Sequence, residues 1–442
     1  MAYIKKLLIL KGLLIVLSNS LFGQNLLTME DAVKTALENN YGIKLLKVDQ
    51  VEARLNNTIG NAGLLPDVSL NLGRNYNVNN TRQQFFNGDV REGNNVQSNT
   101  LNTNIQLNWT VFDGMRMFVR NDMLRKEEEI TDLQWRIQIE RLVADVMDAY
   151  LILQQMKARI EVLQQAVDFS AARRKLTVSK EEIGVASRLD VIQTSVDINS
   201  DSTALVRQVW EMENAKIALN TLLGRQANTP FEIEASAPEI KNLILDNLWS
   251  ATLESNPELE LLQQQIQLAQ LRIKEAKSSY LPEIGLSGGY SFFRSAAEIG
   301  ILKFNQNAGY NYGLTGRWTL FNGMNNRRQV QLAKLDMERQ QLSRDQNLLL
   351  INNQLSQIFN QYQMHLELEK MEKNNVDVAR KNMEISMEKL NIGTITGFEL
   401  REAQNNLIDA EFRLINSQFM TRMSETELQR ISGQLKPKAG WQ

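Results

Sequence analysis

Trp109-Thr110-Val111-Phe112-Asp113-Gly114-Met115-Arg116 is the stretch that decides the fold of this chain, because the sequence contains it twice. The second copy, Trp318-Thr319-Leu320-Phe321-Asn322-Gly323-Met324-Asn325, lies 209 residues further along. In each copy an alternating, strand-like run ends and a long helical pattern begins, with a polar residue and a glycine at the turn between them. Other landmarks recur at nearly the same offset, so the sequence indicates two copies of one structural unit.

The first residues of the chain have the pattern of an export signal. Lys5 and Lys6 form a basic start, residues 7–17 are mostly apolar, and Ser20-Leu21-Phe22-Gly23 ends on a small residue. This order predicts a secretory signal peptide over residues 1–23. No later segment has the roughly 18 uninterrupted apolar residues that a transmembrane helix requires. We therefore divide the mature chain into repeat 1, residues 24–232, and repeat 2, residues 233–442.

Composition excludes several classes of function. The 49 Lys and Arg residues are balanced by 51 Asp and Glu, which gives no reason to expect a nucleic-acid partner. The chain has no cysteine, and its single histidine, His365, cannot form an ordinary metal site alone, so we assign it no function. Phosphate-binding loops and nucleophile elbows are absent from the sequence. We expect no cofactor and no enzymatic activity.

Each repeat begins with a helical pattern, at about residues 28–63 and 243–278, which stops before a Leu-Pro pair. Two alternating strands then follow in each repeat. We expect them at about 67–78, 103–112, 283–293 and 310–321. The Asn- and Gly-rich segments between the strands, about 79–101 and 294–308, are predicted to be loops.

The predicted strands have one apolar face and one face of small polar residues, with aromatic residues near their ends. This pattern is typical of transmembrane β-barrel strands, although strands of soluble sandwiches alternate as well. The export signal and the small polar residues favour the membrane. Four strands cannot close a barrel, for which about eight are the practical minimum. Because unpaired sheet edges are not tolerated in lipid, several chains must share one barrel.

Two helices of unusual length follow the strand pairs, at about 114–183 and 323–392, each roughly 100 Å long at about 1.5 Å per residue. Apolar residues of the first helix recur at alternating steps of four and three, which is typical of a coiled-coil seam. These seam residues are Leu142, Val146, Ala149, Leu153, Met156, Ile160, Leu163 and Val167. Both helices end at an Ile-Gly pair, where glycine favours a C-cap. Shorter helices at about 188–223 and 397–432 complete two hairpins.

With these landmarks the chain resembles the TolC family of outer-membrane efflux proteins. The two Leu-Pro strand entries, the doubled Trp-Thr-x-Phe-(Asp/Asn)-Gly turn and the two Ile-Gly tips support the resemblance, over essentially all of residues 28–435. It implies an α+β membrane protein that forms a homotrimer. Four strands from each chain would form a shared, 12-stranded transmembrane β-barrel in outer-membrane lipid. Coiled-coil helices would continue the barrel as a tunnel in the periplasm of a Gram-negative bacterium.

The resemblance also implies a passive exit duct of a tripartite efflux or type I secretion system, for small molecules or proteins. The duct would receive cargo from an inner-membrane transporter of RND, ABC or MFS type through a periplasmic adaptor, also called a membrane fusion protein. The residues alone also allow a second class of protein, namely a non-conducting structural or adhesive coiled-coil protein of the envelope. The alternating strand pairs favour the duct, because a coiled-coil stalk does not require strands.

The hairpin tips are the first candidate site, and by resemblance they contact the adaptor. Their residues are Gly184, Val185, Ala186, Ser187, Gly393, Thr394, Ile395 and Thr396. A tight turn between two helices would require the same residue types, so that structural role is the alternative.

Acidic residues just after the tips form the second candidate site. By resemblance, Asp190, Glu399 and Glu402 line the periplasmic entrance, where a ring of carboxylates would concentrate cations. Asp190 and Glu399 also have the spacing of a capping box, which is the alternative role for both. Relatives that lock this entrance ionically have an arginine where this chain has Ile395, and Arg188 is the candidate substitute.

The third candidate site lies where strands give way to helices. It contains Trp109, Phe112, Gly114, Trp318, Phe321 and Gly323. The aromatic residues suit the girdle of a membrane interface, and packing at the joint between barrel and tunnel is the alternative.

Overall fold

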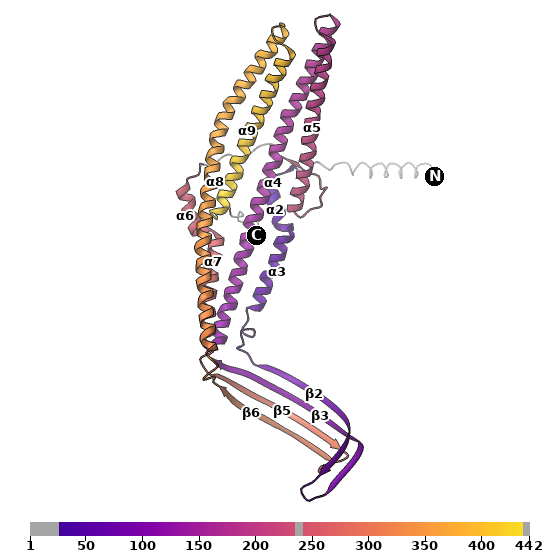
Figure 1. The fold of residues 1–442 in the computed structure, drawn as a ribbon, viewed down its shortest axis with the longest axis vertical. Coiled ribbons are helices and arrows are strands. Elements are labelled where there is room, and N and C mark those ends of the chain that lie inside the picture. Colours follow the sequence, from indigo (N-terminus) through magenta and orange to yellow (C-terminus); the bar gives the residue numbers. More distant parts are fainter. Residues whose placement is uncertain (1–25, 235–241, 436–442) are drawn as a thin grey trace, which may run out of the picture. The chain divides into compact units, whose positions relative to one another are not determined.

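The structure is a computed structural model that describes residues 26–234 and 242–435 (Figure 1). The predicted signal peptide lies outside the described residues. The chain forms two compact units, each built from both repeats. One unit contains the residues up to Lys47 together with Trp135–Leu259 and the residues from Asn347 onward. The other contains Val48–Gln134 and Glu260–Gln346, and we describe each unit by itself.

The second unit contains one antiparallel sheet of four strands, which lie side by side in Figure 1 in the order β2-β3-β5-β6. The strands are β2 (Asp67–Gln84), β3 (Val90–Asp113), β5 (Glu283–Ala297) and β6 (Phe304–Arg317). The predicted loop over 79–101 is wrong, because β2 and β3 stay paired as far as Gln84 and Val90. The predicted loop over 294–308 is likewise too long. Residues 79–84 give no alternating signal because all six are polar, whereas backbone pairing does not require alternation.

The two strand hairpins share one register. Asp67 pairs with Asn108 in the first hairpin, and Glu283 pairs with Arg317 in the second. The first partners are 216 residues apart and the second partners 209. The same two offsets relate every pair down to Asn79 with Val96 and Ser295 with Asn305. The internal repeat predicted from the sequence therefore holds residue by residue in the sheet.

The long helices are α4 (Arg116–Glu182) and α8 (Asn325–Asn391), and both contain 67 residues. Their returning partners, α5 (Arg188–Leu222) and α9 (Gly397–Ile431), contain 35 residues each. The polar residue before each of the two junction glycines caps the helix that follows, as predicted. Asp113 Oδ1 accepts a hydrogen bond from the Met117 amide at 3.1 Å, and Asn322 Oδ1 accepts one from the Asn326 amide at 3.3 Å. These bonds satisfy amides that a helix start leaves unpaired.

The leading helix of each repeat, predicted as one piece, is broken into two. The pieces are α2 (Met29–Asn39), α3 (Tyr41–Asn56), α6 (Leu245–Ser255) and α7 (Pro257–Ser278). Asn40 and Asn256 lie at the breaks, where their side-chain amides donate to the carbonyls of Leu222 and Ile431 at 2.9 and 2.8 Å. Each asparagine is thus non-helical, and its side chain binds the C-terminal end of the returning helix of a hairpin.

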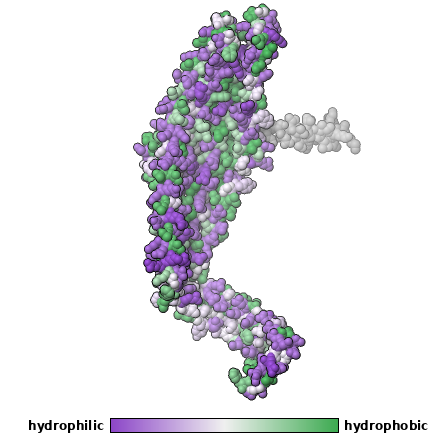
Figure 2. Space-filling view, in the orientation of Figure 1, coloured by the Kyte–Doolittle hydropathy of each residue, from purple (hydrophilic) through white to green (hydrophobic). Residues whose placement is uncertain are grey.

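The core of the first unit follows the predicted seam of α4. Leu142, Val146, Leu153 and Leu163 are all buried. A short parallel pair that the sequence did not reveal, β1 (Leu26–Leu27) and β4 (Glu232–Ile233), lies against this core. None of the described helices is long and apolar enough to cross a membrane, and polar residues predominate on the helical surface drawn in Figure 2.

The two junction glycines provide a matched test of the fold. Both have a left-handed backbone, with φ of 72° at Gly114 and 67° at Gly323. A Cβ at Gly114 would lie 2.3 Å from the Ser278 carbonyl oxygen, whereas at Gly323 the nearest atom is 3.9 Å away. We expect Gly323→Ala to cost about 1 kcal/mol through backbone strain and Gly114→Ala roughly 1–3 kcal/mol more through the added clash. Thermal denaturation of each variant in detergent measures the difference, and equal losses would contradict it.

Candidate functional site

Both hairpin tips close through the same glycine-dependent turn. Gly184 has φ of 77° and Gly393 has φ of 80°. The residue after each glycine donates its amide to the carbonyl five residues earlier, at 2.8 Å from Val185 and 2.9 Å from Thr394. This bond is typical of the Schellman motif, which satisfies the last carbonyls of a helix. The eight predicted tip residues form these two turns.

The acidic residues after the tips form capping boxes. The Ser187 amide donates to Asp190 Oδ2 at 2.9 Å, and the Thr396 amide donates to Glu399 Oε2 at 2.7 Å. In return the hydroxyls of Ser187 and Thr396 accept the amides of Asp190 and Glu399. The capping role that the sequence left as an alternative is therefore present for both.

Capping also keeps these exposed groups charged. The hydroxyl and amide of Ser187 hold the pKa of the Asp190 carboxyl below its usual range. The amide and hydroxyl of Thr396 lower the pKa of Glu399 in the same way. Glu402 is exposed on the next turn of α9. A carboxylate with a lowered pKa stays ionised to a more acidic pH, so the tips keep their negative charge in mild acid.

Arg188, the candidate substitute for the arginine of an ionic lock, forms its ion pair inside one hairpin of the chain. Ile395, at the position where some relatives have arginine, packs against an apolar cluster that includes Met383 and Leu400. Arg188 lies 3.5 Å from Glu181, so its ion pair stays within the first hairpin. The tip of the second hairpin is thus held by this apolar contact together with the hydrogen bond from Lys180 Nζ to the Leu390 carbonyl at 3.2 Å.

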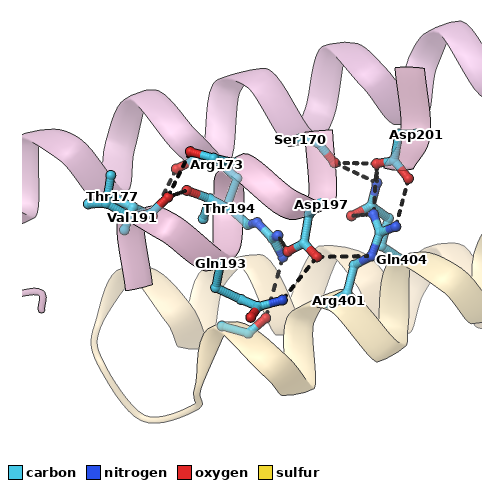
Figure 3. A network of polar contacts seen from close by, with 12 residues as sticks. Ser170, Arg173, Thr177, Val191, Gln193, Thr194, Asp197, Asp201, Arg401 and Gln404 are labelled. Atoms are coloured by element: carbon cyan, nitrogen blue, oxygen red, sulfur yellow. Dashed lines mark hydrogen bonds and ion pairs between the residues drawn. The ribbon is translucent and has the colours of Figure 1, made fainter. Parts of the chain in front are cut away.

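A buried polar network behind the tips joins the hairpins instead (Figure 3). Arg401 on α9 donates from both terminal nitrogens to Asp201 on α5, at 2.6 and 2.7 Å. Asp201 also accepts the Ser170 hydroxyl at 2.5 Å, and Gln404 Nε2 donates to Ser170 Oγ at 3.2 Å. Three helices, α4, α5 and α9, therefore meet at one carboxylate.

A second ion pair continues this network towards the tips. The guanidinium of Arg173 is 2% exposed and pairs with Asp197, one turn before Asp201. Its Nη1 also donates to the Gly397 carbonyl, at the first residue of α9, at 3.4 Å. Burial lowers the pKa of Arg173, but two carboxylates facing two guanidinium groups leave the cluster without net charge. Charges removed from water require such pairing.

Sequence reasoning missed this network, although a signal for it was present. After Val167 the seam of α4 requires an apolar residue at the next step, and Ser170 occupies that position. A polar residue at one seam position often specifies register in coiled coils. Asp197 and Asp201 are four residues apart and share one face of α5.

The tryptophans of the doubled turn make equivalent contacts in the two repeats. Trp109 Nε1 donates to the Leu64 carbonyl and Trp318 Nε1 to the Tyr280 carbonyl, both at 3.0 Å. Each contact fastens the end of a strand to the segment that leads into the preceding strand of the same repeat. Phe112 pairs with Ile284 in the sheet, whereas Phe321 lies beyond the end of β6 and is 75% exposed. These contacts support packing at the junction. The exposed rings are also compatible with a position at a membrane interface.

Known proteins share this architecture. Residues 32–225 and 248–434 match the family model described as outer membrane efflux protein. The alkaline protease secretion protein AprF of Pseudomonas aeruginosa is 22% identical over 420 residues, which are 90% of this chain and 85% of AprF. The outer-membrane channel OprN is 18% identical with a TM-score of 0.75, over 93% of this chain and 90% of OprN. The CmeC outer membrane channel of Campylobacter jejuni is 15% identical with a TM-score of 0.74, over 93% of this chain and 87% of CmeC.

The Arg401–Asp201 pair can be tested by a double-mutant cycle. Arg401→Met leaves a buried, unpaired carboxylate, so we expect a loss of about 3–5 kcal/mol in the free energy of unfolding. Adding Asp201→Leu should restore part of that loss, because an apolar pair has no charge to desolvate. Denaturant unfolding in detergent measures both.

Arg188→Met is the matched control, since its ion pair is exposed and should contribute less than about 1 kcal/mol. If Arg401→Met costs no more than this control, the network does not hold the hairpins together.

Proposed function

The chain belongs to the outer membrane efflux protein family, and on that basis we propose that three copies of it share one β-barrel and one helical tunnel. Family members are outer-membrane channels of efflux and secretion systems, and this protein is such a channel in a Gram-negative envelope. Its role is transport, and the energy for transport comes from elsewhere in the assembly. The non-conducting coiled-coil protein considered from the sequence is thereby set aside.

Unpaired sheet edges are the observation that supports shared assembly. Among the described strands, β2 and β6 each have a neighbour on one side alone. In lipid every backbone N–H and C=O group needs a partner within the protein, and four strands are too few to provide one. Copies of the same chain can satisfy both edges at once, because β2 of one copy can pair with β6 of the next.

Exposed apolar seams on two helices support the same assembly. On α8 these residues recur at multiples of seven, which is the repeat of a coiled coil. They are Leu350, Met364, Met371, Val378 and Ile385, each at least 48% exposed, and Ile392, just beyond the end of α8, continues the spacing. On α5 a second exposed seam contains Leu189, Ile192, Val196, Val206, Trp210 and Ile217. The two seams fit a contact in which α8 of one copy packs against α5 of the next.

The hairpin tips are proposed to contact a periplasmic adaptor, which connects the duct to an inner-membrane transporter. Apolar residues are exposed around both tips, with Val185 70% and Phe398 78% accessible. Such residues suit a protein partner better than water. AprF is named for secretion of a protease, so its similarity favours protein cargo as one candidate beside small molecules.

Asp190, Glu399 and Glu402 are proposed to line the entrance of the tunnel. Their exposure and the lowered pKa values of the first two support this role, since capping leaves the charge accessible. Three copies would repeat each carboxylate around the axis and attract cations. Trp109, Phe112, Trp318 and Phe321 are proposed to lie at the membrane interface, where aromatic rings are enriched.

Conductance of the purified protein in planar bilayers tests the duct and its entrance together. We expect discrete channels that polyvalent cations block from the tip side. Combining Glu399→Gln with Glu402→Gln should raise the blocking concentration by about tenfold or more, because the local potential becomes less negative. Glutamine at position 399 also preserves the capping box, so the fold is kept. Wild-type block should persist at pH 5, where the pKa of Glu399 keeps it ionised.

Glu211→Gln, which removes an exposed carboxylate far along α5, is the control and should leave the block unchanged. A protein without conductance would contradict the duct. If the double variant conducts and is blocked at the same cation concentration as the wild type, the acidic entrance would be contradicted. The duct would then still stand.

A further inference from the structure

The two faces of the four-stranded sheet differ in chemistry. Directly opposite residues of neighbouring strands share a face, so the register defines rows of side chains across the sheet. One face has small and polar residues from the row of Asp67 to the row of Asn75, apart from Phe293. The other face is mostly apolar, and in a barrel such a face meets lipid. Its successive rows contain Trp109, Leu286 and Leu314; Val68, Leu107 and Tyr312; Leu70, Ile105, Tyr290 and Tyr310; and Leu72 and Phe292.

The apolar face ends at a row that contains two arginines. Arg74 on β2 and Arg294 on β5 both lie opposite Leu101 of β3, so both side chains are on the face that meets lipid. Two strand spacings of about 4.8 Å place their backbones about 10 Å apart. The next row on this face contains Tyr76 and Phe304. Positive charge thus replaces apolar side chains at one defined level of the sheet.

Each arginine stacks on an aromatic ring of that next row. The guanidinium of Arg74 lies 4.8 Å from the centre of the Tyr76 ring, and the guanidinium of Arg294 lies 5.1 Å from the centre of the Phe304 ring. Arg74 Nε also donates to Asn99 Oδ1 at 3.4 Å. Both arginines are exposed. Stacking orients a guanidinium while leaving most of its N–H groups available to an anion.

Neither arginine has an acidic partner in the part of the chain that the structure describes. Arg82, further along β2, differs in this respect, because it pairs with Glu92 at 2.8 Å. The Glu298 carboxylate, beyond the end of β5, accepts the Gln97 amide at 2.9 Å. The row of Arg74 therefore has two positive charges that the described residues do not neutralise.

The arginine row lies one membrane thickness away from the doubled turn. Leu101 precedes Trp109 by eight residues on β3, and about nine to eleven tilted residues cross the apolar core of a membrane. With Trp109 at the periplasmic interface, as proposed above, the arginine row reaches the opposite boundary. Tyr76 and Phe304 suit the aromatic girdle of that boundary. Both arginines then lie at the level of the headgroups of the outer leaflet.

We propose that Arg74 and Arg294 together bind the phosphate groups of one phosphorylated lipid in the outer leaflet. Guanidinium groups bind phosphate through two parallel hydrogen bonds and stay charged at physiological pH. Two of them about 10 Å apart fit a headgroup with two phosphates, such as a diphosphorylated glycolipid, better than a phospholipid with one. The stems of the arginines and their aromatic partners contact the acyl chains. The inference rests on the barrel proposed above and adds a lipid that it binds.

Lipid titrations of the purified protein in detergent, followed by native mass spectrometry, test this site. The probes are diphosphoryl lipid A, monophosphoryl lipid A, phosphatidylglycerol and inorganic phosphate. One variant combines Arg74→Gln with Arg294→Gln, and a second combines Arg74→Lys with Arg294→Lys, which keeps both charges. Arg317→Gln is the matched control, because Arg317 is exposed on the same sheet but pairs with Glu283 in a row of the polar face, at the end near the helices.

We expect the wild-type protein to bind diphosphoryl lipid A about tenfold or more tightly than phosphatidylglycerol, with monophosphoryl lipid A between them. The glutamine variant should lose about tenfold or more in affinity for the diphosphoryl lipid, because both charged hydrogen-bond donors are gone. The lysine variant should lose less, and Arg317→Gln should bind as the wild type does.

Equal affinity of the wild type and the glutamine variant for diphosphoryl lipid A would overturn the lipid site and leave the barrel standing. Equal loss in the glutamine and lysine variants would also overturn it, since the loss would not follow charge. If inorganic phosphate displaces the lipid at an equal concentration, the site binds simple anions and the lipid is excluded. A protein that does not float with lipid vesicles would overturn the barrel, and the lipid site with it.

Discussion

The open edges that β2 and β6 leave on the sheet of described strands are the constraint on which the rest of this structure depends. A soluble sheet can leave its edges to water, but a sheet in lipid cannot, because each unpaired N–H or C=O group costs several kcal/mol there. Four strands cannot curl far enough to meet, so the edges can be satisfied by further copies of the chain. In the proposed assembly, the exposed seams on α5 and α8 are the helical counterpart of the same rule, since a neighbouring copy would cover both.

The two repeats agree in geometry and differ in charge. Strand register, the tryptophan contacts and the asparagines at the helix breaks all recur at fixed offsets. The buried polar network does not recur. Counting 209 residues between repeats, Arg401 corresponds to Ile192, Asp201 to Ala410 and Ser170 to Ala379. The joint between the two hairpins of one chain is therefore ionic, and the residues at these three equivalent positions, Ile192, Ala410 and Ala379, cannot form the same ion pair.

Local signals explain how much of the fold the sequence predicted. The ends of the long helices were predicted within two residues, because glycine and a polar cap mark them on the chain itself. Strand lengths were wrong where the residues of Asn79–Gln84 are all polar and do not alternate. The break at Asn40 depends on a carbonyl 182 residues away, and the polar network depends on three helices. The partner of Asn40 is not marked by any local pattern, and the one local signal of the network is the polar Ser170 on the seam of α4.

Native mass spectrometry of the protein extracted from outer membranes tests the central claim most directly. If neighbouring copies complete the sheet, the smallest stable species in mild detergent contains three chains, and dissociation of the trimer exposes the edges and leads to loss of the folded sheet. A folded, stable monomer would contradict the account, because it would show that β2 and β6 need no partner from another copy.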